Sequence, residues 1–275
     1  MAGTGTAHLR DEALLRVEHL VVEYRMPGGD RLHAVSDVSL DLLEGETLGL
    51  VGESGCGKSS AGRAIVGHVG ATSGRVWFEG RDVLELHGEA LRDLRVQLQM
   101  IFQDPVSSLN PRRPVEKVVG EGLRLWRRGK GVEQAAKVRE VMEAVGLTYE
   151  PEAKRRRHQF SGGQCQRICI ARSLVLDPKV IVCDEPVSSL DVSVQAQILN
   201  LLKDMKDRYG LSLVFISHDL SVVKHISDRI AVMYMGKICE VAEPEVLYER
   251  PKHPYTAALL ASIPVPDPDR PSAHL

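Results

Sequence analysis

Residues 46–60 hold the feature that most constrains this chain. The short apolar stretch ETLGLV leads into GESGCGKSS, and a helical pattern follows. This matches G-x-x-x-x-G-K-[ST] placed between a strand and a helix, a context that a chance glycine turn rarely has. In such a loop the glycines let backbone N–H groups wrap phosphate oxygens, the lysine reaches the β- and γ-phosphates, and the hydroxyl can bind Mg²⁺. We therefore predict a nucleotide-phosphate site formed by Gly52, Glu53, Ser54, Gly55, Cys56, Gly57, Lys58, Ser59 and Ser60.

Alternating strand and helix patterns predict the surrounding architecture. The stretch 14–45 alternates as two strands around the turn MPGGDR, and charge-rich helical sequence dominates from about 115 to 155. Strand KVIVC, a helix around VQAQILNLLKDMKDRY and strand LSLVFIS follow. Strands that alternate with helices in this way predict a mostly parallel sheet covered on both faces.

Polar side chains follow four of the predicted strands. LGLV leads into Gly52, VIVC into Asp184 and Glu185, VFIS into His218, and LQMIF into Gln103. Ligands of parallel α/β sheets gather beyond the carboxyl ends of the strands, so we expect one shared site. Asp184 is predicted to hold Mg²⁺ through water, and Glu185 to orient and deprotonate a water that attacks the γ-phosphate. Acids at strand ends are often only solvated, so this prediction depends on the preceding glycine loop.

A second glycine pair opens another helix, because FSGGQ at 160–164 precedes CQRICIARSLVL. Free backbone N–H groups and the helix dipole make such a start an anion site. A plain glycine helix cap is the alternative, although it leaves the serine and the glutamine unexplained. The sequence therefore contains two potential phosphate-binding segments, and the role of the second one has to be explained.

Composition excludes several classes of function. The chain has 275 residues, a net charge of −2 and a pI near 6.6, which give no general attraction to nucleic acid. We expect no secretory signal and no membrane span in this sequence. Five cysteines without a C-x-x-C pattern fit a reduced, cytoplasmic compartment. Cys165 and Cys169, four residues apart on a predicted helix, either pack in a core or share a metal, and packing is the stronger interpretation.

The ordered set GESGCGKS, IFQDP, SGGQ, VIVCDEP, SSLD and ISHDL resembles the nucleotide-binding subunit of an ABC transporter, over about residues 15 to 265. The resemblance implies an α/β fold with a P-loop NTPase (RecA-like) core, an antiparallel β subdomain and an inserted α-helical subdomain. It also implies the following division: a flexible N-terminus over 1–13, an ATP-binding core with its β subdomain over 14–102 and 165–245, a Q-loop and helical signature subdomain over 103–164, and an importer-type tail over 246–275.

The same resemblance implies a reason for the second cradle. In this family two ATPase subunits face each other head to tail, and each SGGQ caps the γ-phosphate held by the other subunit. The residues that would serve the partner's ATP are Ser161, Gly162, Gly163 and Gln164. Asp191 in SSLD would cross the interface between the two subunits.

Family roles for the remaining positions follow from the matching motifs. Tyr24 resembles the aromatic residue that stacks on adenine, although a plain strand tyrosine remains the alternative. Gln103 would touch Mg²⁺ and the attacking water, and its loop would sense a membrane partner. His218 would hydrogen-bond the γ-phosphate. The expected ligands are ATP and Mg²⁺, with Ser59, Gln103 and Asp184 around the metal.

Two segments indicate which transporters are most similar. QDPVSSLNPR at 103–112 and KHPYTAALLASIPVPDP at 252–268 are similar to ATPases of oligopeptide, dipeptide and nickel importers. The resemblance implies a peripheral protein at the cytoplasmic face of the cell membrane, with two permease subunits, an extracytoplasmic binding protein and a second ATPase subunit, which we expect to be a different chain. The basic run KRRRH at 154–158 departs from this branch and is either a solvated helix end or a contact for an anionic partner.

Three alternatives remain open at this stage. An importer of nickel or another small solute would share these motifs. A soluble ABC ATPase that acts on DNA or the ribosome is a different class, but such proteins tend to carry heptad arms, zinc cysteines or two cassettes, and the near-neutral charge argues against nucleic acid. A small-molecule kinase would share the glycine loop and leave SGGQ and His218 without a role.

Overall fold

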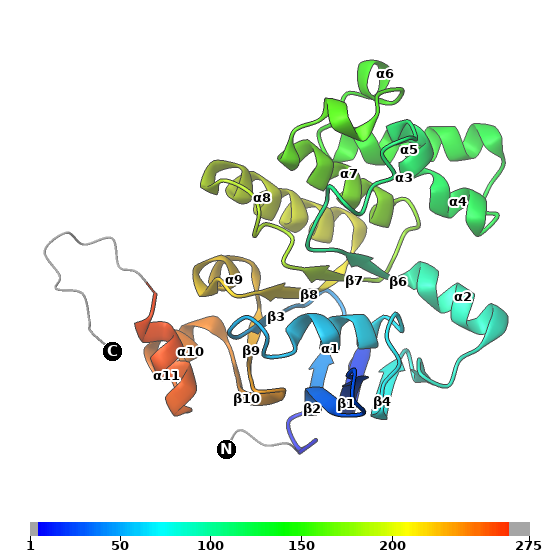
Figure 1. Ribbon diagram of the computed structural model, residues 1–275. Coiled ribbons are helices and arrows are strands. Elements are labelled where there is room, and N and C mark those ends of the chain that lie inside the picture. Colours follow the sequence, from blue (N-terminus) through cyan, green and yellow to red (C-terminus); the bar gives the residue numbers. More distant parts are fainter. Residues whose placement is uncertain (1–4, 264–275) are drawn as a thin grey trace, which may run out of the picture.

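The computed structural model describes residues 5–263, which form two β-sheets and the helices around them (Figure 1). The central sheet has the strand order β10-β9-β3-β8-β7-β6, with strands β3 (Thr47–Val51), β6 (Leu98–Ile101), β7 (Val180–Asp184), β8 (Ser212–Ser217), β9 (Arg229–Tyr234) and β10 (Lys237–Ala242). Its strand pairs are parallel except for the edge pair β9–β10, which is antiparallel. The predicted mostly parallel sheet is therefore confirmed.

Successive residues of the central strands belong to two different hydrophobic cores. In β7, Ile181 packs into one core and Val182 into the other, and Phe215 and Ile216 of β8 divide in the same way. Both faces are thus buried, because side chains alternate along a strand. Helices α7 (Gly162–Leu174), α8 (Val192–Tyr209) and α9 (Leu220–Ile226) cover one face, whereas α1 (Lys58–Ile65) and the second sheet cover the other.

The second sheet is antiparallel, as the family resemblance implies. Its order is β2-β1-β4-β5, with strands β1 (Leu15–Arg25), β2 (Arg31–Leu42), β4 (Ser73–Phe78) and β5 (Arg81–Asp82). Strands β1 and β2 are the two N-terminal strands that the alternating sequence predicts. β4, β5 and the following helix α2 (Gly88–Gln97) have no counterpart in the expectations from the sequence.

The inserted helical region lies above the central sheet in Figure 1. It contains α3 (Val115–Val119), α4 (Glu121–Leu125), α5 (Gly131–Ala144), α6 (Tyr149–Glu152) and a 3₁₀ turn at Arg157–Gln159. Helices α3 and α5 pack against α7 through fully buried side chains such as Val119, Val141 and Met142. The charge-rich sequence of this region therefore folds as helices around α7, which also packs against β6 of the central sheet.

Both ends of the described chain pack against the body. The predicted flexible terminus spans 1–13; residues 1–4 lie outside the described range, and Arg10 forms ion pairs with Asp41 and Glu46. At the other end, α10 (Pro244–Glu249) and α11 (Pro254–Ala261) pack beside the β9–β10 hairpin, and residues 264–275 of the predicted tail lie outside the described range. No helix within 5–263 has the length and apolar character needed to cross a bilayer.

Candidate active site

The loop between β3 and α1 has backbone positions that only glycine can occupy. Gly52 has φ +153°, and a Cβ there would lie 2.1 Å from the carbonyl oxygen of Met233. Gly57 has φ +107°, and a Cβ there would lie 2.0 Å from the carbonyl oxygen of Ala34. Since L-residues avoid positive φ and real atoms do not approach this closely, the spacing of the two glycines follows from the loop's conformation.

Lys58, the first residue of α1, is the buried cation of this loop. Its side chain is only 4% exposed, and its Nζ donates to the carbonyl oxygens of Gly52 at 2.7 Å and Glu53 at 2.9 Å. A cavity of about 400 Å³ opens beside it, lined in part by Tyr24, Ser54, Gly55, Lys58, Ser59, Ser60, Gln103 and Glu185. A phosphate group in this cavity would lie beside the Lys58 ammonium group, which could release the two backbone carbonyl oxygens and bind phosphate oxygens instead.

Asp184, the last residue of β7, is fully buried behind the loop. Its Oδ1 accepts a hydrogen bond from the Ser59 hydroxyl at 2.6 Å, whereas Oδ2 has no hydrogen-bond donor within residues 5–263. The nearest cation is Arg63 on α1, whose Nη2 lies 3.7 Å from Oδ2. Burial raises the pKa of Asp184, partly offset by the Ser59 hydrogen bond.

An unpaired carboxylate oxygen beside a serine hydroxyl fits a Mg²⁺ ion, which prefers oxygen ligands and keeps waters and substrate phosphates around it. Within residues 5–263 no group of three or more His, Cys, Asp and Glu side chains forms a metal cage. Asp184 and Ser59 are placed to contribute oxygen ligands from the protein side, and phosphate oxygens and water would be needed to complete the coordination.

Glu185 lies between two other polar side chains at the same edge of the sheet. Its Oε2 accepts a hydrogen bond from Gln103 Nε2 at 2.9 Å, and its Oε1 lies 3.4 Å from His218 Nδ1. Its backbone has φ +47°, a strained conformation for a glutamate, and its N–H donates to the carbonyl of Ile216 at 3.0 Å. Strain of this kind persists where surrounding contacts fix a residue, often at functional sites.

Tyr24 reaches the same cavity from the antiparallel sheet. Its hydroxyl donates to Ser60 Oγ at 3.2 Å. The tyrosine therefore lies beside the start of α1, where it lines the cavity next to Lys58. Together with Gln103, Asp184, Glu185 and His218, the predicted P-loop and strand-end residues are thus assembled in one place. Arg63, which faces Asp184, is a charged neighbour that the sequence motifs did not identify.

The second predicted cradle does not join this cavity within one chain. Ser161 caps α7: its hydroxyl accepts from Gln164 N–H at 3.3 Å, and Gln164 Oε1 accepts from Ser161 N–H at 3.0 Å. Asp191 caps α8 by accepting a hydrogen bond from Val194 N–H at 3.0 Å, and a Cβ on Gly163 would lie 2.6 Å from Val194 of that helix. The SGGQ segment and Asp191 therefore occupy neighbouring helix starts, and none of them lines the cavity beside Lys58.

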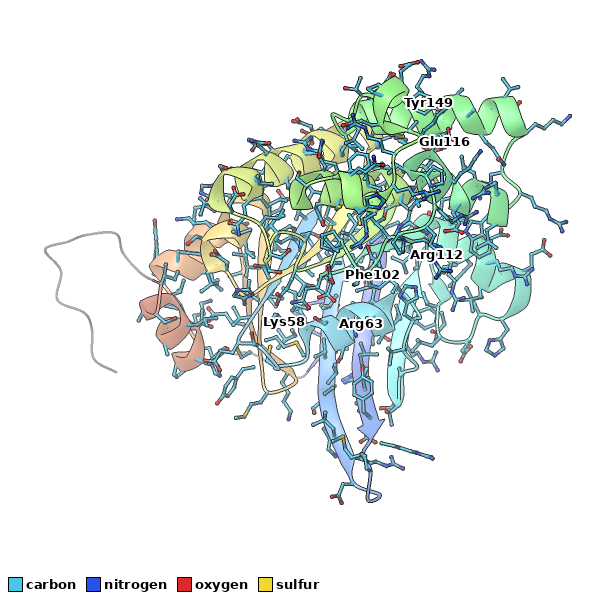
Figure 2. All side chains as sticks on the ribbon, turned by 45° about the horizontal axis from the view of Figure 1, so that its top comes forward. Lys58, Arg63, Phe102, Arg112, Glu116 and Tyr149 are labelled. Atoms are coloured by element: carbon cyan, nitrogen blue, oxygen red, sulfur yellow. The ribbon has the colours of Figure 1, made fainter. Side chains whose placement is uncertain are left out.

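A larger cavity of about 880 Å³ lies on the other side of Gln103. Arg63 of α1 and Phe102, both labelled in Figure 2, line it. Leu125, 68% exposed, and Trp126 line it from the end of α4. Gln103 lines both cavities, so one side chain connects this open groove to Glu185.

All five cysteines lie within the described residues, and each is a free, buried thiol. Burial raises the pKa of Cys183 to about 12, which leaves it protonated at neutral pH. Cys169 lies 3.2 Å from the Ser108 hydroxyl, and Cys165 lies 4.0 Å from the carbonyl oxygen of Arg157, so the two thiols pack against different segments beside α7.

Comparisons with known proteins agree with this geometry. Residues 35–188 match the family model described as "ABC transporter", and residues 239–274 match "Oligopeptide/dipeptide transporter, C-terminal region". The chain is 51% identical over 263 residues to the oligopeptide transport ATP-binding protein OppF of Bacillus subtilis, covering 94% of this chain and 85% of the relative. It is 49% identical to OppF of Salmonella typhimurium, covering 94% of this chain and 80% of the relative.

Among solved structures, the dimeric post-hydrolysis state of the ATP-binding cassette MJ0796 bound to ADP and Pi superimposes with a TM-score of 0.75. The two sequences are 27% identical, and the match covers 84% of this chain and 98% of that one. That cassette was captured as a dimer with its nucleotide products.

Proposed function

Because the chain belongs to the ABC transporter family of ATP-binding subunits, we propose that it binds and hydrolyses ATP to drive an importer of oligopeptides or dipeptides. The observation that supports hydrolysis most directly is the placement of Glu185. It lies between Gln103 and His218 at the edge of the cavity that Lys58 lines.

In this proposal ATP enters the cavity with its phosphates over the glycine loop. Lys58 leaves the carbonyl oxygens of Gly52 and Glu53 and binds the β- and γ-phosphates, while Tyr24 stacks on adenine. Ser59, Gln103 and Asp184 would hold Mg²⁺, which when bound would supply positive charge to the phosphate oxygens.

Glu185 acts as the general base on the attacking water. The water oxygen bonds to the γ-phosphorus, the bond from that phosphorus to the β–γ bridging oxygen breaks, and the Glu185 carboxylate accepts the water proton. ADP and inorganic phosphate are the products. Gln103 and His218 fix the direction of this carboxylate, and His218 also binds the γ-phosphate.

The second cradle acts on a partner's nucleotide. A phosphate bound at the start of α7 would meet free backbone N–H groups and the positive end of the helix dipole, a site that is unused within one chain. We therefore assign Ser161, Gly162, Gly163 and Gln164 to the ATP of a second ATPase subunit, with Asp191 at the same interface. ATP stabilises the closed pair because it binds that state better, and hydrolysis releases it.

The groove beside Gln103 receives a cytoplasmic segment of a permease. Its lining mixes charged side chains with Phe102, Leu125 and Trp126, as a peptide-sized contact requires. Since Gln103 touches Glu185, movement of such a segment would be transmitted to the reaction site. Residues 14–102 and 165–245 thus serve as the ATP-binding core, 103–164 as the coupling and signature region, and 246–275 as an importer-type tail.

The full assembly in this proposal contains two permeases, a different second ATPase subunit and an extracytoplasmic binding protein, with this chain peripheral at the cytoplasmic face of the membrane. The test compares peptide uptake in cells that carry the unmodified chain, Glu185→Gln or the exposed control Glu143→Gln. We expect Glu185→Gln to reduce uptake by roughly 10²–10⁴-fold, the usual contribution of a general base, and Glu143→Gln to leave it unchanged.

Fractionation of the same cells decides between the classes of function. Co-purification with two permeases supports the importer. Recovery with DNA or ribosomes instead, or full peptide uptake with Glu185→Gln, contradicts it. If cells with Glu185→Gln lose nickel uptake but keep peptide uptake, the proposal that peptides are the substrate is contradicted.

A further inference from the structure

The C-terminal helix α11 contacts the phosphate-binding loop from outside the nucleotide cavity (Figure 1). The Tyr255 hydroxyl oxygen accepts a hydrogen bond from the backbone N–H of Glu53 at 3.0 Å. Glu53 is the second residue of the glycine loop, and its carbonyl oxygen accepts from Lys58 Nζ at 2.9 Å. One residue of the loop therefore binds Tyr255 through its N–H and the phosphate-binding lysine through its carbonyl.

Tyr255 is itself held in place by a chain of partly buried contacts. The Glu240 carboxylate, 7% exposed, accepts from the N–H groups of Lys252 at 2.9 Å and His253 at 3.0 Å. His253 Nδ1 then accepts from the Tyr255 N–H at 3.1 Å, which caps α11. The Tyr255 ring packs on Tyr234 with ring centroids 4.2 Å apart. The hydroxyl thus reaches the loop from a fixed position.

The β9–β10 hairpin supports the same side of the loop. Gly236 N–H donates to the carbonyl of Cys56 at 2.9 Å, and the Met233 carbonyl fills the space beside Gly52. These groups and Tyr255 do not line the cavity next to Lys58. The C-terminal segment therefore holds the loop from behind and leaves its phosphate-facing side free.

We propose that Tyr255 is a positioning residue for ATP binding, which holds the Glu53 peptide in the orientation that the loop needs to receive phosphates. The proposal rests on ATP being the ligand of the loop. If the loop adopts its phosphate-binding conformation for only a fraction of the time, its apparent Kd for nucleotide equals the intrinsic Kd divided by that fraction. By reciprocity, nucleotide bound to the loop also stabilises the docked position of α11.

The test is Tyr255→Phe in the full chain, which removes the hydroxyl and keeps the ring that packs on Tyr234. We expect the Kd for MgATP to rise by roughly threefold to tenfold, the usual effect of one net hydrogen bond. The Glu53 amide should exchange with solvent faster in nucleotide-free Tyr255→Phe, and MgATP should no longer slow amide exchange in 255–261. A general loss of fold stability would not change MgATP affinity, Glu53 exchange and the nucleotide response of α11 together.

Tyr248→Phe is the matched control, because Tyr248 on α10 donates its hydroxyl to the carbonyl of Leu220 and not to the loop. It should keep MgATP affinity and Glu53 exchange unchanged. Equal loss of affinity in both variants, or an unchanged Kd and Glu53 exchange in Tyr255→Phe, would overturn the role of Tyr255. If the unmodified chain does not bind MgATP, the proposed ATPase function itself fails.

Discussion

The substitution Asp184→Asn tests two effects of one buried carboxylate: its cost to the stability of the nucleotide-free fold and its role in binding MgATP. Asp184 is fully buried, Oδ2 has no hydrogen-bond donor within residues 5–263, and burial raises the pKa of the carboxyl. Between the ordinary pKa and this raised one, the folded state binds more protons than the unfolded state. Stability is therefore lost as pH rises through that window, and at neutral pH the carboxylate destabilises the nucleotide-free protein.

The size of the effect follows from the contacts. A buried acceptor without a partner costs about 1–3 kcal/mol. Asparagine retains an oxygen for the Ser59 hydroxyl and buries a neutral NH₂ in place of the charged oxygen, which is less costly. Arg63 is 44% exposed and loses an ion pair worth about 0–1 kcal/mol. The net gain is about 1 kcal/mol, or roughly 2–4 °C in Tm.

Thermal unfolding with and without MgATP measures both effects. Asp184→Asn should unfold at a higher temperature without nucleotide and lose most of the stabilisation that MgATP gives the unmodified chain. Asp41→Asn is the control: Asp41 is 1% exposed and paired with Arg10 and Arg229. It should lose about 3–5 kcal/mol and keep the MgATP shift. An Asp184→Asn protein that is less stable without nucleotide, or that keeps the full MgATP shift, would refute the reasoning.

Three further substitutions test the loop, the second cradle and the adenine contact. Gly57 has φ +107°, and Gly57→Ala would place a Cβ 2.0 Å from the Ala34 carbonyl oxygen, so titrations should show MgATP affinity reduced by roughly tenfold or more. Gly45 has φ +70° with open space around it, and Gly45→Ala should leave MgATP affinity unchanged. Ser161→Ala removes a helix cap worth about 1 kcal/mol. It should lower the ATPase rate of the assembled pair of subunits and leave MgATP binding by the single chain unchanged. Reduced MgATP binding by the single chain would contradict a role of Ser161 on the partner's ATP. Tyr24→Ala should weaken ATP binding by roughly threefold to tenfold through lost ring stacking, and Tyr24→Phe should not; equal affinities for all three chains would exclude the stacking role.

The sequence predicts the parallel sheet and the P-loop because each has a local signal. Strand β7 ends at Asp184 and strand β8 ends directly before His218, and both are apolar runs whose successive side chains are buried on opposite faces of the sheet. The glycine spacing in the loop reflects positive φ at Gly52 and Gly57. The short strands β4 and β5 lack such a signal. β4 pairs with β1, which is distant from it in the sequence, and β5 pairs with β4 through the short turn that joins them.

Side-chain partners across the fold follow from tertiary structure alone. Arg63 is one of many basic residues in the sequence, and only the position of α1 brings it to Asp184. Tyr255 lies 202 residues from Glu53, and its hydroxyl meets the loop only because the β9–β10 hairpin carries α11 there. The sequence could identify the segment KHPYTAALL but gave no reason to connect it with the P-loop.

The most direct test of the account is the structure of the Glu185→Gln chain bound to MgATP together with its ATPase partner. We expect a closed pair in which Ser161 and the two following glycines of this chain bind the γ-phosphate held by the partner, while Lys58 of this chain binds a second ATP. A closed pair with ATP on Lys58 and residues 161–164 remote from every triphosphate would contradict it.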